Sequence, residues 1–184
     1  MKARTRNRFL STLAIGMGAL LAGCSSNGSK PDVVLAEDIS IERSRVIAVL
    51  DKLHDSAAKA ALTDYMRCYA PDAIFLGTDA TERWNMTEFS LFCKHHFVER
   101  GVGWKYTAIG GRRFVHVAQE GKSAWFDEAL WNEKYGECRG TGVMRKTLDG
   151  WQIVQYNLTM PVPNALAEKV SQLTRELKPA GERP

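Results

Sequence analysis

A change in hydrophobic period at Gly103 determines the expected fold class. Beyond this residue apolar and polar side chains alternate, as in half-buried β-strands, and glycine-containing pairs separate the alternating stretches. Asp149-Gly150 is the clearest hairpin turn among these pairs, because both residue types tolerate the positive φ angles of a two-residue turn. The region therefore predicts antiparallel strands at 104–109, 113–119, 123–133, 137–147 and 151–160.

Helical periodicity precedes and follows this strand region. Apolar residues recur at helical spacing from Ile41 to Tyr69, which predicts one long amphipathic helix, either straight or bent near Asp55-Ser56. A short strand is expected at 73–76. Asn85 and Glu88 have the spacing of a capping box at the start of a second helix. An apolar stripe after Asn164 predicts a C-terminal helix. This order predicts an α+β domain in which helices pack on the concave face of a curved antiparallel sheet.

The N-terminal segment has the order of an export signal. Basic residues lie between positions 2 and 8, an uncharged apolar run follows at 9–21, and small residues precede Cys24. The run is too short for a comfortable membrane span. Ala22-Gly23-Cys24 resembles a bacterial lipobox, which implies cleavage before Cys24 and attachment of lipid to it; the alternative is a free or disulfide-bonded Cys24 behind an ordinary cleavage site. The resemblance of Ser25 to a sorting pattern implies an outer-membrane anchor and a domain that faces the periplasm.

The charge balance and the segment boundaries follow from this interpretation. Removing the four basic charges of the signal leaves 21 Lys and Arg against 21 Asp and Glu, from totals of 25 and 21. Because these charges are interspersed, the sequence argues against nucleic-acid binding. The expected organisation is a signal at 1–23, the lipidated cysteine and a tether at 24–37, one domain at 38–178 and a tail at 179–184.

The other cysteines leave two interpretations open. Cys68, Cys93 and Cys138 are an odd number, so they hold at most one internal disulfide, for example between Cys68 and Cys93, or they are buried small hydrophobic residues. His95-His96 does not predict a metal pair, because neighbouring side chains on a helix point about 100° apart. We therefore expect no metal and no cofactor.

Two junctions carry a resemblance to a known superfamily. Tyr69-Ala70-Pro71-Asp72-Ala73 lies between the first helix and the first strand, and Gly150-Trp151-Gln152-Ile153 opens the last strand. In this order they resemble the SnoaL-like, nuclear-transport-factor-2-like superfamily, which has a cone-shaped fold and includes ketosteroid isomerases, polyketide cyclases, dehydratases and binding or dimerisation modules. The resemblance implies a pocket inside the cone and a homodimer through the outer sheet face, where Arg139 is expected.

Strand register and the resemblance together predict the pocket lining. A two-residue turn at Asp149-Gly150 would pair Met144 with Gln155 and Gly142 with Asn157 on one sheet face. The resemblance implies that this face points inward and that Asp127 does so on the preceding strand. The predicted lining consists of Trp125, Gly140, Gly142, Met144, Gln155, Asn157 and Tyr69.

The resemblance also weakens one activity and leaves others open. The general base of the ketosteroid isomerases falls on Gly77, their oxyanion acid on Gly142 and their oxyanion tyrosine on Leu53. Asp127 and His54 remain as candidate catalytic groups, with purely structural roles as the alternative for each. Asp79 is either a group at the pocket rim or part of a turn that precedes the second helix.

The expected function is that of an envelope lipoprotein whose cone binds a small apolar or carbonyl-containing molecule. Two alternatives remain: a non-catalytic assembly or dimerisation module of the cell envelope, and an isomerase, cyclase or dehydratase that uses Asp127. The scarcity of paired titratable groups in the predicted pocket favours binding over catalysis.

Overall fold

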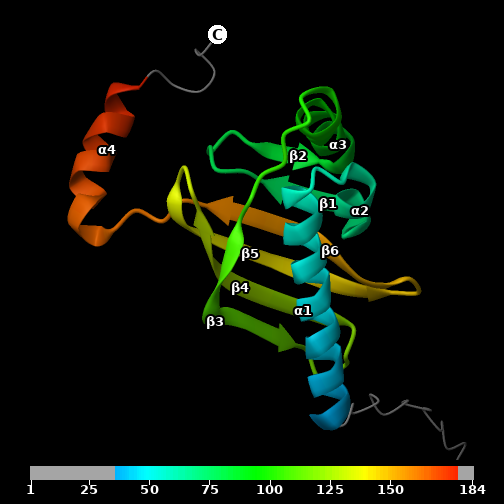
Figure 1. Ribbon diagram of the computed structural model, residues 1–184. Coiled ribbons are helices and arrows are strands. Elements are labelled where there is room, and N and C mark those ends of the chain that lie inside the picture. Colours follow the sequence, from blue (N-terminus) through cyan, green and yellow to red (C-terminus); the bar gives the residue numbers. More distant parts are fainter. Residues whose placement is uncertain (1–35, 178–184) are drawn as a thin grey trace, which may run out of the picture. The chain divides into compact units, whose positions relative to one another are not determined.

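The computed structural model describes residues 36–177, so the predicted signal, Cys24 and the tail at 179–184 lie outside the described residues. Helices and strands follow one another in an α+β order, as predicted (Figure 1). The elements are α1 Ala36–Ala58, α2 Leu62–Arg67, β1 Tyr69–Leu76, β2 Arg83–Asn85, α3 Met86–Lys94, the π-helical turn η1 His95–Glu99, β3 Thr107–Val117, β4 Ser123–Asn132, β5 Gly136–Thr147, β6 Gly150–Thr159, the 3-10 turn η2 Asn164–Leu166 and α4 Ala167–Glu176.

The strands of the described region form one curved six-stranded sheet in the order β2-β1-β6-β5-β4-β3. The pairs β1–β2, β3–β4, β4–β5 and β5–β6 are antiparallel, whereas β1 and β6 run parallel. The predicted α+β class and curved sheet are confirmed, but the sheet is mixed and not wholly antiparallel. Parallel neighbours require a long connection, and the chain from β2 through β5 supplies it.

The Gly110-Gly111 pair lies inside a strand, and the turn predicted there is wrong. β3 continues through it with a change of register between Ala108 and Arg113. Gly111 has a φ of +73°, which glycine adopts without steric cost and which is typical of a bulge. The pair therefore bends one strand where the sequence predicted two.

The long helix predicted from Ile41 to Tyr69 is broken after Ala58. Ala60 has a φ of +54°, which interrupts the helix before α2 begins. The segment before β3 fills the break: Trp104 N–H donates to the Ala57 carbonyl at 3.1 Å. A Cβ on Gly103 would lie 2.6 Å from the Ala58 carbonyl oxygen, so glycine permits this close approach. A tertiary contact thus uses a carbonyl that a continuing helix would have used.

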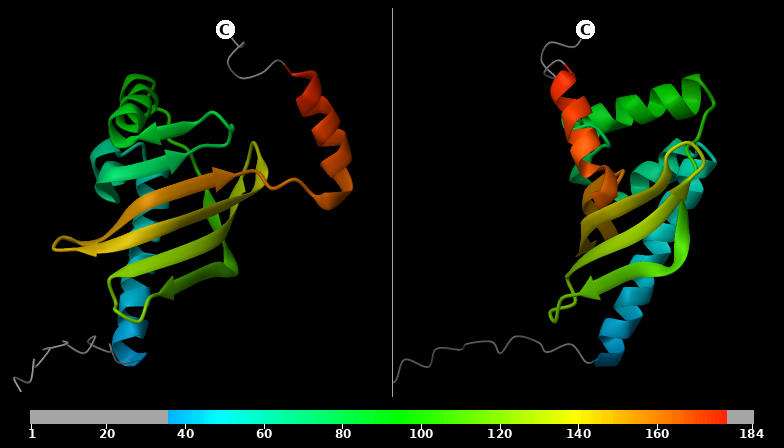
Figure 2. Two further views of the ribbon diagram at one scale, coloured as in Figure 1. Left: turned by 180° about the vertical axis from the view of Figure 1, so that it is seen from behind. Right: turned by 90° about the vertical axis from the view of Figure 1, so that its left-hand side faces the viewer.

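Helix α1 packs along one face of the sheet, as both views of Figure 2 show. Val46, Leu50, Leu53 and Ala57 are buried at helical spacing, which explains how the predicted stripe becomes part of the core. Near the start of the helix, the buried Glu42 accepts a hydrogen bond from Trp151 Nε1 at 2.6 Å. This bond ties the N-terminal half of α1 to the β5–β6 hairpin.

The predicted capping box at the start of α3 is confirmed. Asn85 Oδ1 accepts from the backbone N–H groups of Thr87 and Glu88 at 3.0 Å, and Glu88 Oε2 accepts from Asn85 N–H at 3.1 Å. Trp84 and Phe89, on either side of the cap, have ring centroids 5.7 Å apart. This pair is a hydrophobic staple that sets the angle at which the chain enters the helix.

The predicted C-terminal helix is present as α4. All residues from 160 to 177 are exposed, including the apolar stripe formed by Leu166, Val170, Leu173 and Leu177. Within residues 36–177 no helix has the length and hydropathy that a membrane crossing requires.

Candidate functional site

A cavity of about 270 Å³ lies among α1, β1, α3 and the segment that leads into β3. Its lining is dominated by aromatic rings, with a few polar groups among them. The lining residues are Leu53, His54, Ala57, Tyr65, Phe75, Gly77, Thr78, Glu82, Trp84, Phe89, Phe92, His96, Trp104, Tyr106, Tyr135, Tyr156 and Leu158.

Ring packing holds this lining in place. Phe75 on β1 stacks on Phe89 of α3, with ring centroids 3.9 Å apart. Phe92 lies one helical turn further, with its ring centroid 4.6 Å from that of Trp84 and 5.8 Å from that of Trp104. Aromatic side chains have few rotamers, so such a cluster forms a firm wall with little loss of conformational entropy on ligand binding.

One end of the lining is connected to a buried ionic network. His54 Nε2 lies 2.7 Å from Glu128 Oε1, and Arg113 Nε donates to Glu128 Oε2 at 2.8 Å. The Glu128 side chain has no exposed surface. Arg113 also pairs with Asp51 on α1. The network therefore links α1 to strands β3 and β4 beneath the cavity.

The network fixes the orientation of the His54 ring. A carboxylate can only accept hydrogen bonds, so Nε2 of His54 is the donor to Glu128. Tyr156 donates to the same Glu128 oxygen at 3.2 Å. Burial raises the pKa of Tyr156 well above its ordinary value, so its hydroxyl remains a donor. His54 is thus held in a fixed orientation on the lining by a carboxylate that two side chains share.

Glu82 supplies the carboxylate of the lining. Gly77 lies beside it, and a Cβ on that glycine would overlap Glu82 Oε2. The same oxygen accepts a hydrogen bond from the Asp79 backbone N–H at 3.1 Å. The position on which the isomerase base falls therefore has no side chain, and the carboxylate of the residue just before β2 occupies the adjacent space.

Asp127 and Trp125 lie on the outer sheet face, contrary to the prediction. The β4–β5 register pairs Phe126 with Gly142 and Glu128 with Gly140, so the even-numbered residues of β4 point inward. Asp127 is exposed, and Trp125 stacks on the His116 ring at 5.5 Å on that outer face. The predicted register of β4 was displaced by one residue, and such a shift moves every side chain of a strand to the opposite face of the sheet.

Gln155 and Asn157 are also displaced from the lining. The register passes from Met144–Ile153 to Val143–Gln155, which leaves Val154 as an extra residue in β6. Beyond this bulge the inward positions are Tyr156 and Leu158, both of which line the cavity. The predicted pairs of Met144 with Gln155 and of Gly142 with Asn157 are therefore wrong.

Gly140, Gly142, Met144 and Tyr69 do not line the cavity, although the first three share the predicted inward face. The space next to Gly142 is filled by the Phe126 ring, and that next to Gly140 by Tyr156 and Glu128. Met144 is fully buried in the core. Tyr69 is buried, and its hydroxyl lies 3.1 Å from that of Tyr65. These glycines make room for side chains of the core and open no cavity.

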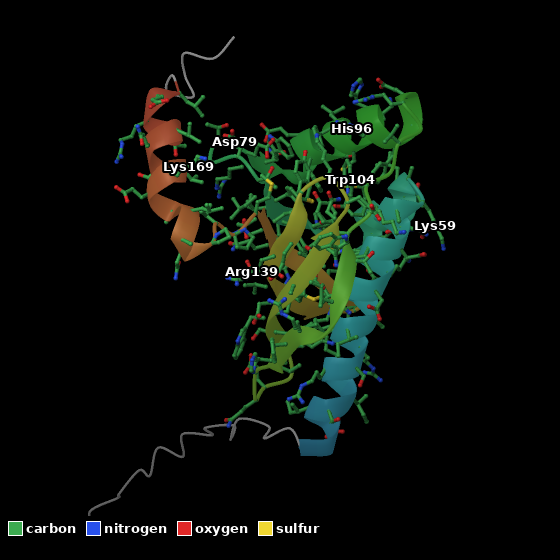
Figure 3. All side chains as sticks on the ribbon, turned by 60° about the vertical axis from the view of Figure 1, so that its left-hand side comes forward. Lys59, Asp79, His96, Trp104, Arg139 and Lys169 are labelled. Atoms are coloured by element: carbon green, nitrogen blue, oxygen red, sulfur yellow. The ribbon has the colours of Figure 1, made fainter. Side chains whose placement is uncertain are left out.

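Asp79 organises the loop between β1 and β2. Its Oδ1 accepts hydrogen bonds from Thr81 N–H at 3.0 Å and from Thr81 Oγ1 at 2.8 Å, which is the geometry of an Asx turn. Figure 3 shows Asp79 at the same end of the domain as His96 and Trp104. The turn interpretation accounts for these contacts.

The sequence prediction missed Glu82 and Glu128. Trp125 to Leu130 is apolar on both faces, so alternation could not decide whether Asp127 or Glu128 points inward. Glu82 lies two residues before Trp84, which belongs to the short strand β2. The sequence did not predict this strand, so the signal for Glu82 was missed. His54 is the candidate catalytic residue that does line the cavity.

The outer sheet face carries Arg139, as expected, together with exposed aromatic rings. Phe114, Trp125 and Trp131 are each about half exposed there. The predicted homodimer through this face stays a prediction.

The cysteines and the acidic residues form no metal site in the described part of the chain. Cys68, Cys93 and Cys138 are buried free thiols. Burial raises the pKa of Cys68 to about 11 and that of Cys93 to about 12, so neither is a thiolate at neutral pH. Among residues 36–177, no group of three or more His, Cys, Asp or Glu side chains is arranged to hold a metal ion.

Comparisons with known proteins agree with this architecture. The family model described as "SnoaL-like domain" matches residues 46–163. No curated protein matches the sequence.

Solved structures resemble the chain at low identity, which bears on the fold alone. A domain of unknown function with a cystatin-like fold from Nostoc punctiforme has a TM-score of 0.59 and 15% identity, over 82% of this chain and 93% of that chain. Two proteins from Novosphingobium aromaticivorans are also similar. One, an NTF2-like protein with a cystatin-like fold, has a TM-score of 0.54 and 12% identity over 71% and 89% of the chains. The other, a putative aromatic ring hydroxylase, has a TM-score of 0.53 and 13% identity, over 67% of this chain and 92% of that chain.

Proposed function

This chain belongs to the SnoaL-like domain family, and we propose that it is a binding protein that holds a small, mainly apolar molecule in its cavity. The observation that carries the proposal is a cavity of about 270 Å³ with aromatic walls. Ligand sites are commonly concave and mainly apolar, with a few polar groups that orient the ligand. The NTF2-like fold often binds small ligands, and the geometry here has these features.

The size and polarity of the cavity define the ligand further. A dry engineered cavity of about 150 Å³ binds benzene, so about 270 Å³ fits a molecule of one or two rings with a short substituent. Tyr106 on the lining can donate a hydrogen bond to a ligand carbonyl. Burial raises the pKa of its hydroxyl to about 12, so it stays protonated. A ligand with a ring and a carbonyl group is therefore compatible with the site.

Filling the cavity is expected to abolish binding. Thr78 is exposed and belongs to the lining, so Thr78→Trp would place an indole in the opening. We expect 2-acetylnaphthalene to bind saturably to the wild type, with a change in tryptophan fluorescence, and to bind at least about tenfold more weakly to the variant.

Thr87→Trp is the matched control, because Thr87 is also exposed but lies outside the lining. It should bind the probe as the wild type does. Absence of saturable binding to the wild type, together with no small molecule retained by the purified protein in mass spectrometry, would reject the proposed function.

We also propose that the protein is an exported lipoprotein, anchored in the outer membrane through Cys24 and facing the periplasm. The support is the order of basic segment, apolar run and small residues before Cys24. Expressed in a bacterium with two membranes, the wild type should incorporate labelled palmitate and sediment with outer-membrane vesicles, and Cys24→Ser should do neither. Equal label in both proteins would contradict the assignment of Cys24.

A further inference from the structure

The described lining residues of the cavity include an acidic side chain and no lysine or arginine. Glu82 is the carboxylate on the lining, and no lysine or arginine is among the lining residues that the structure describes. His96 is neutral near pH 7, because burial lowers its pKa and Arg100 adds to the effect. The lining therefore offers a negative charge to a ligand and no fixed positive charge.

The arginine of the network behind His54 already has carboxylate partners. Arg113 contributes one positive charge to it, whereas Asp51 and Glu128 contribute two negative charges. Arg113 is thus already paired with both carboxylates on the sheet side of the cavity. A ligand anion would lose its hydration without gaining a cationic partner, which is costly in a site of low dielectric constant.

The Glu82 carboxylate has capacity for a further partner. A carboxylate has about four lone-pair sites, and within residues 36–177 the Glu82 carboxylate accepts a hydrogen bond from the Asp79 N–H at Oε2. Gly77 keeps the adjacent space free of another side chain, since a Cβ there would overlap the carboxylate. The group is half-buried, so water screens it less than it screens a surface acid.

Aromatic faces next to this carboxylate would attract a cation as well. Trp84 lies two residues after Glu82, and its ring packs against Phe92, which in turn packs against Trp104. Ammonium groups are attracted to ring faces, most strongly to those of tryptophan, and aromatic cages bind quaternary ammonium groups in this way. The chain itself makes one such contact at the lining, where Lys134 Nζ lies 4.8 Å from the centroid of the Tyr135 ring.

We propose that the ligand of this cavity is an organic cation, an apolar molecule with an amine or quaternary ammonium group that pairs with Glu82 beside Trp84. The inference rests on the proposed binding function and names the class of ligand. It follows from a half-buried carboxylate, an aromatic wall and a lining without lysine or arginine.

Three probes of nearly equal shape test this class directly. Benzyltrimethylammonium is the cation, neopentylbenzene is its neutral isostere, and phenylmethanesulfonate is an anion of similar size. By titration calorimetry or tryptophan fluorescence, the cation should bind at least about tenfold more tightly than the neutral isostere, and the sulfonate should not bind detectably.

Glu82→Gln should weaken binding of the cation at least about tenfold and change that of the neutral isostere less than about twofold. Glu168→Gln, which removes the same charge from the exposed helix α4, is the control and should leave all three affinities unchanged. Circular dichroism would show that both variants fold. If Glu82→Gln does not fold, the affinities of the three probes for the wild type decide the class of ligand by themselves.

The outcomes separate the two proposals. Equal binding of the cation and the neutral isostere, or tight binding of the sulfonate, would overturn the organic-cation inference and leave the binding function standing. If neither these probes nor 2-acetylnaphthalene bind, and no small molecule is retained, both proposals fail together.

Discussion

Replacing Glu128 by alanine is expected to lower the free energy of unfolding by about 3 kcal/mol, the range found when one partner of a buried ion pair is removed. Glu128 is fully buried and accepts from His54, Arg113 and Tyr156. Without it, the His54 and Tyr156 donors lose their shared acceptor. Arg113 loses its buried partner and keeps only Asp51 near the surface. Urea denaturation followed by circular dichroism measures the change.

Asp127→Ala is the control for this prediction, because the two acids are neighbours on β4 and point to opposite faces. Asp127 is exposed, so the substitution should leave the free energy of unfolding within about 0.5 kcal/mol of the wild type. If Asp127→Ala were the more destabilising change, the register of β4 described above would be wrong.

Gly142→Ala is expected to destabilise the domain by about 2 kcal/mol, as overpacking of a filled core does. A Cβ at this position would overlap the Gln155 carbonyl oxygen and would lie 2.7 Å from Cζ of Phe126. The Gln155 carbonyl belongs to the sheet backbone, so relief requires the β5–β6 ladder to move. Thermal denaturation should show a lower midpoint, of the order of 5 °C for a domain of this size.

Gly110→Ala is the matched control, since a Cβ there would meet no atom within 4 Å. It should change stability little or raise it slightly, because alanine restricts the unfolded chain more than glycine does. If Gly142→Ala were as well tolerated as Gly110→Ala, Gly142 would border open space, and the close packing described here would be wrong.

Prediction of individual elements succeeded where the signal is local. The capping box at Asn85 and Glu88 is confirmed because both partners lie within one helical turn. The end of α1 was missed because its cause is distant in sequence: Trp104 N–H bonds to the Ala57 carbonyl from the segment before β3. A helical stripe that continues through a break cannot reveal such a contact.

The site was harder to predict than the fold, since a single residue of register decides which side chains point inward. At the β5–β6 hairpin, β5 ends at Thr147 and β6 begins at Gly150, so the turn is one residue earlier than predicted. The bulge at Val154 then exchanges Gln155 for Tyr156 on the inner face. Glu82 lies on the lining because β2, the strand that follows it, pairs with β1 across a loop.

The sequence alone determined the periodicity, the cap of α3 and the succession of a helical region, a strand region and a C-terminal helix, and through them the fold class, because each depends on side chains close together in the chain. The tertiary structure decided the pocket: which acid of Asp127 and Glu128 is buried, which glycines are filled by neighbours, and which carboxylate lines the cavity. Those choices depend on strand register and close packing between distant segments. One extra residue in a strand reverses them without altering the hydrophobic pattern from which the fold was predicted.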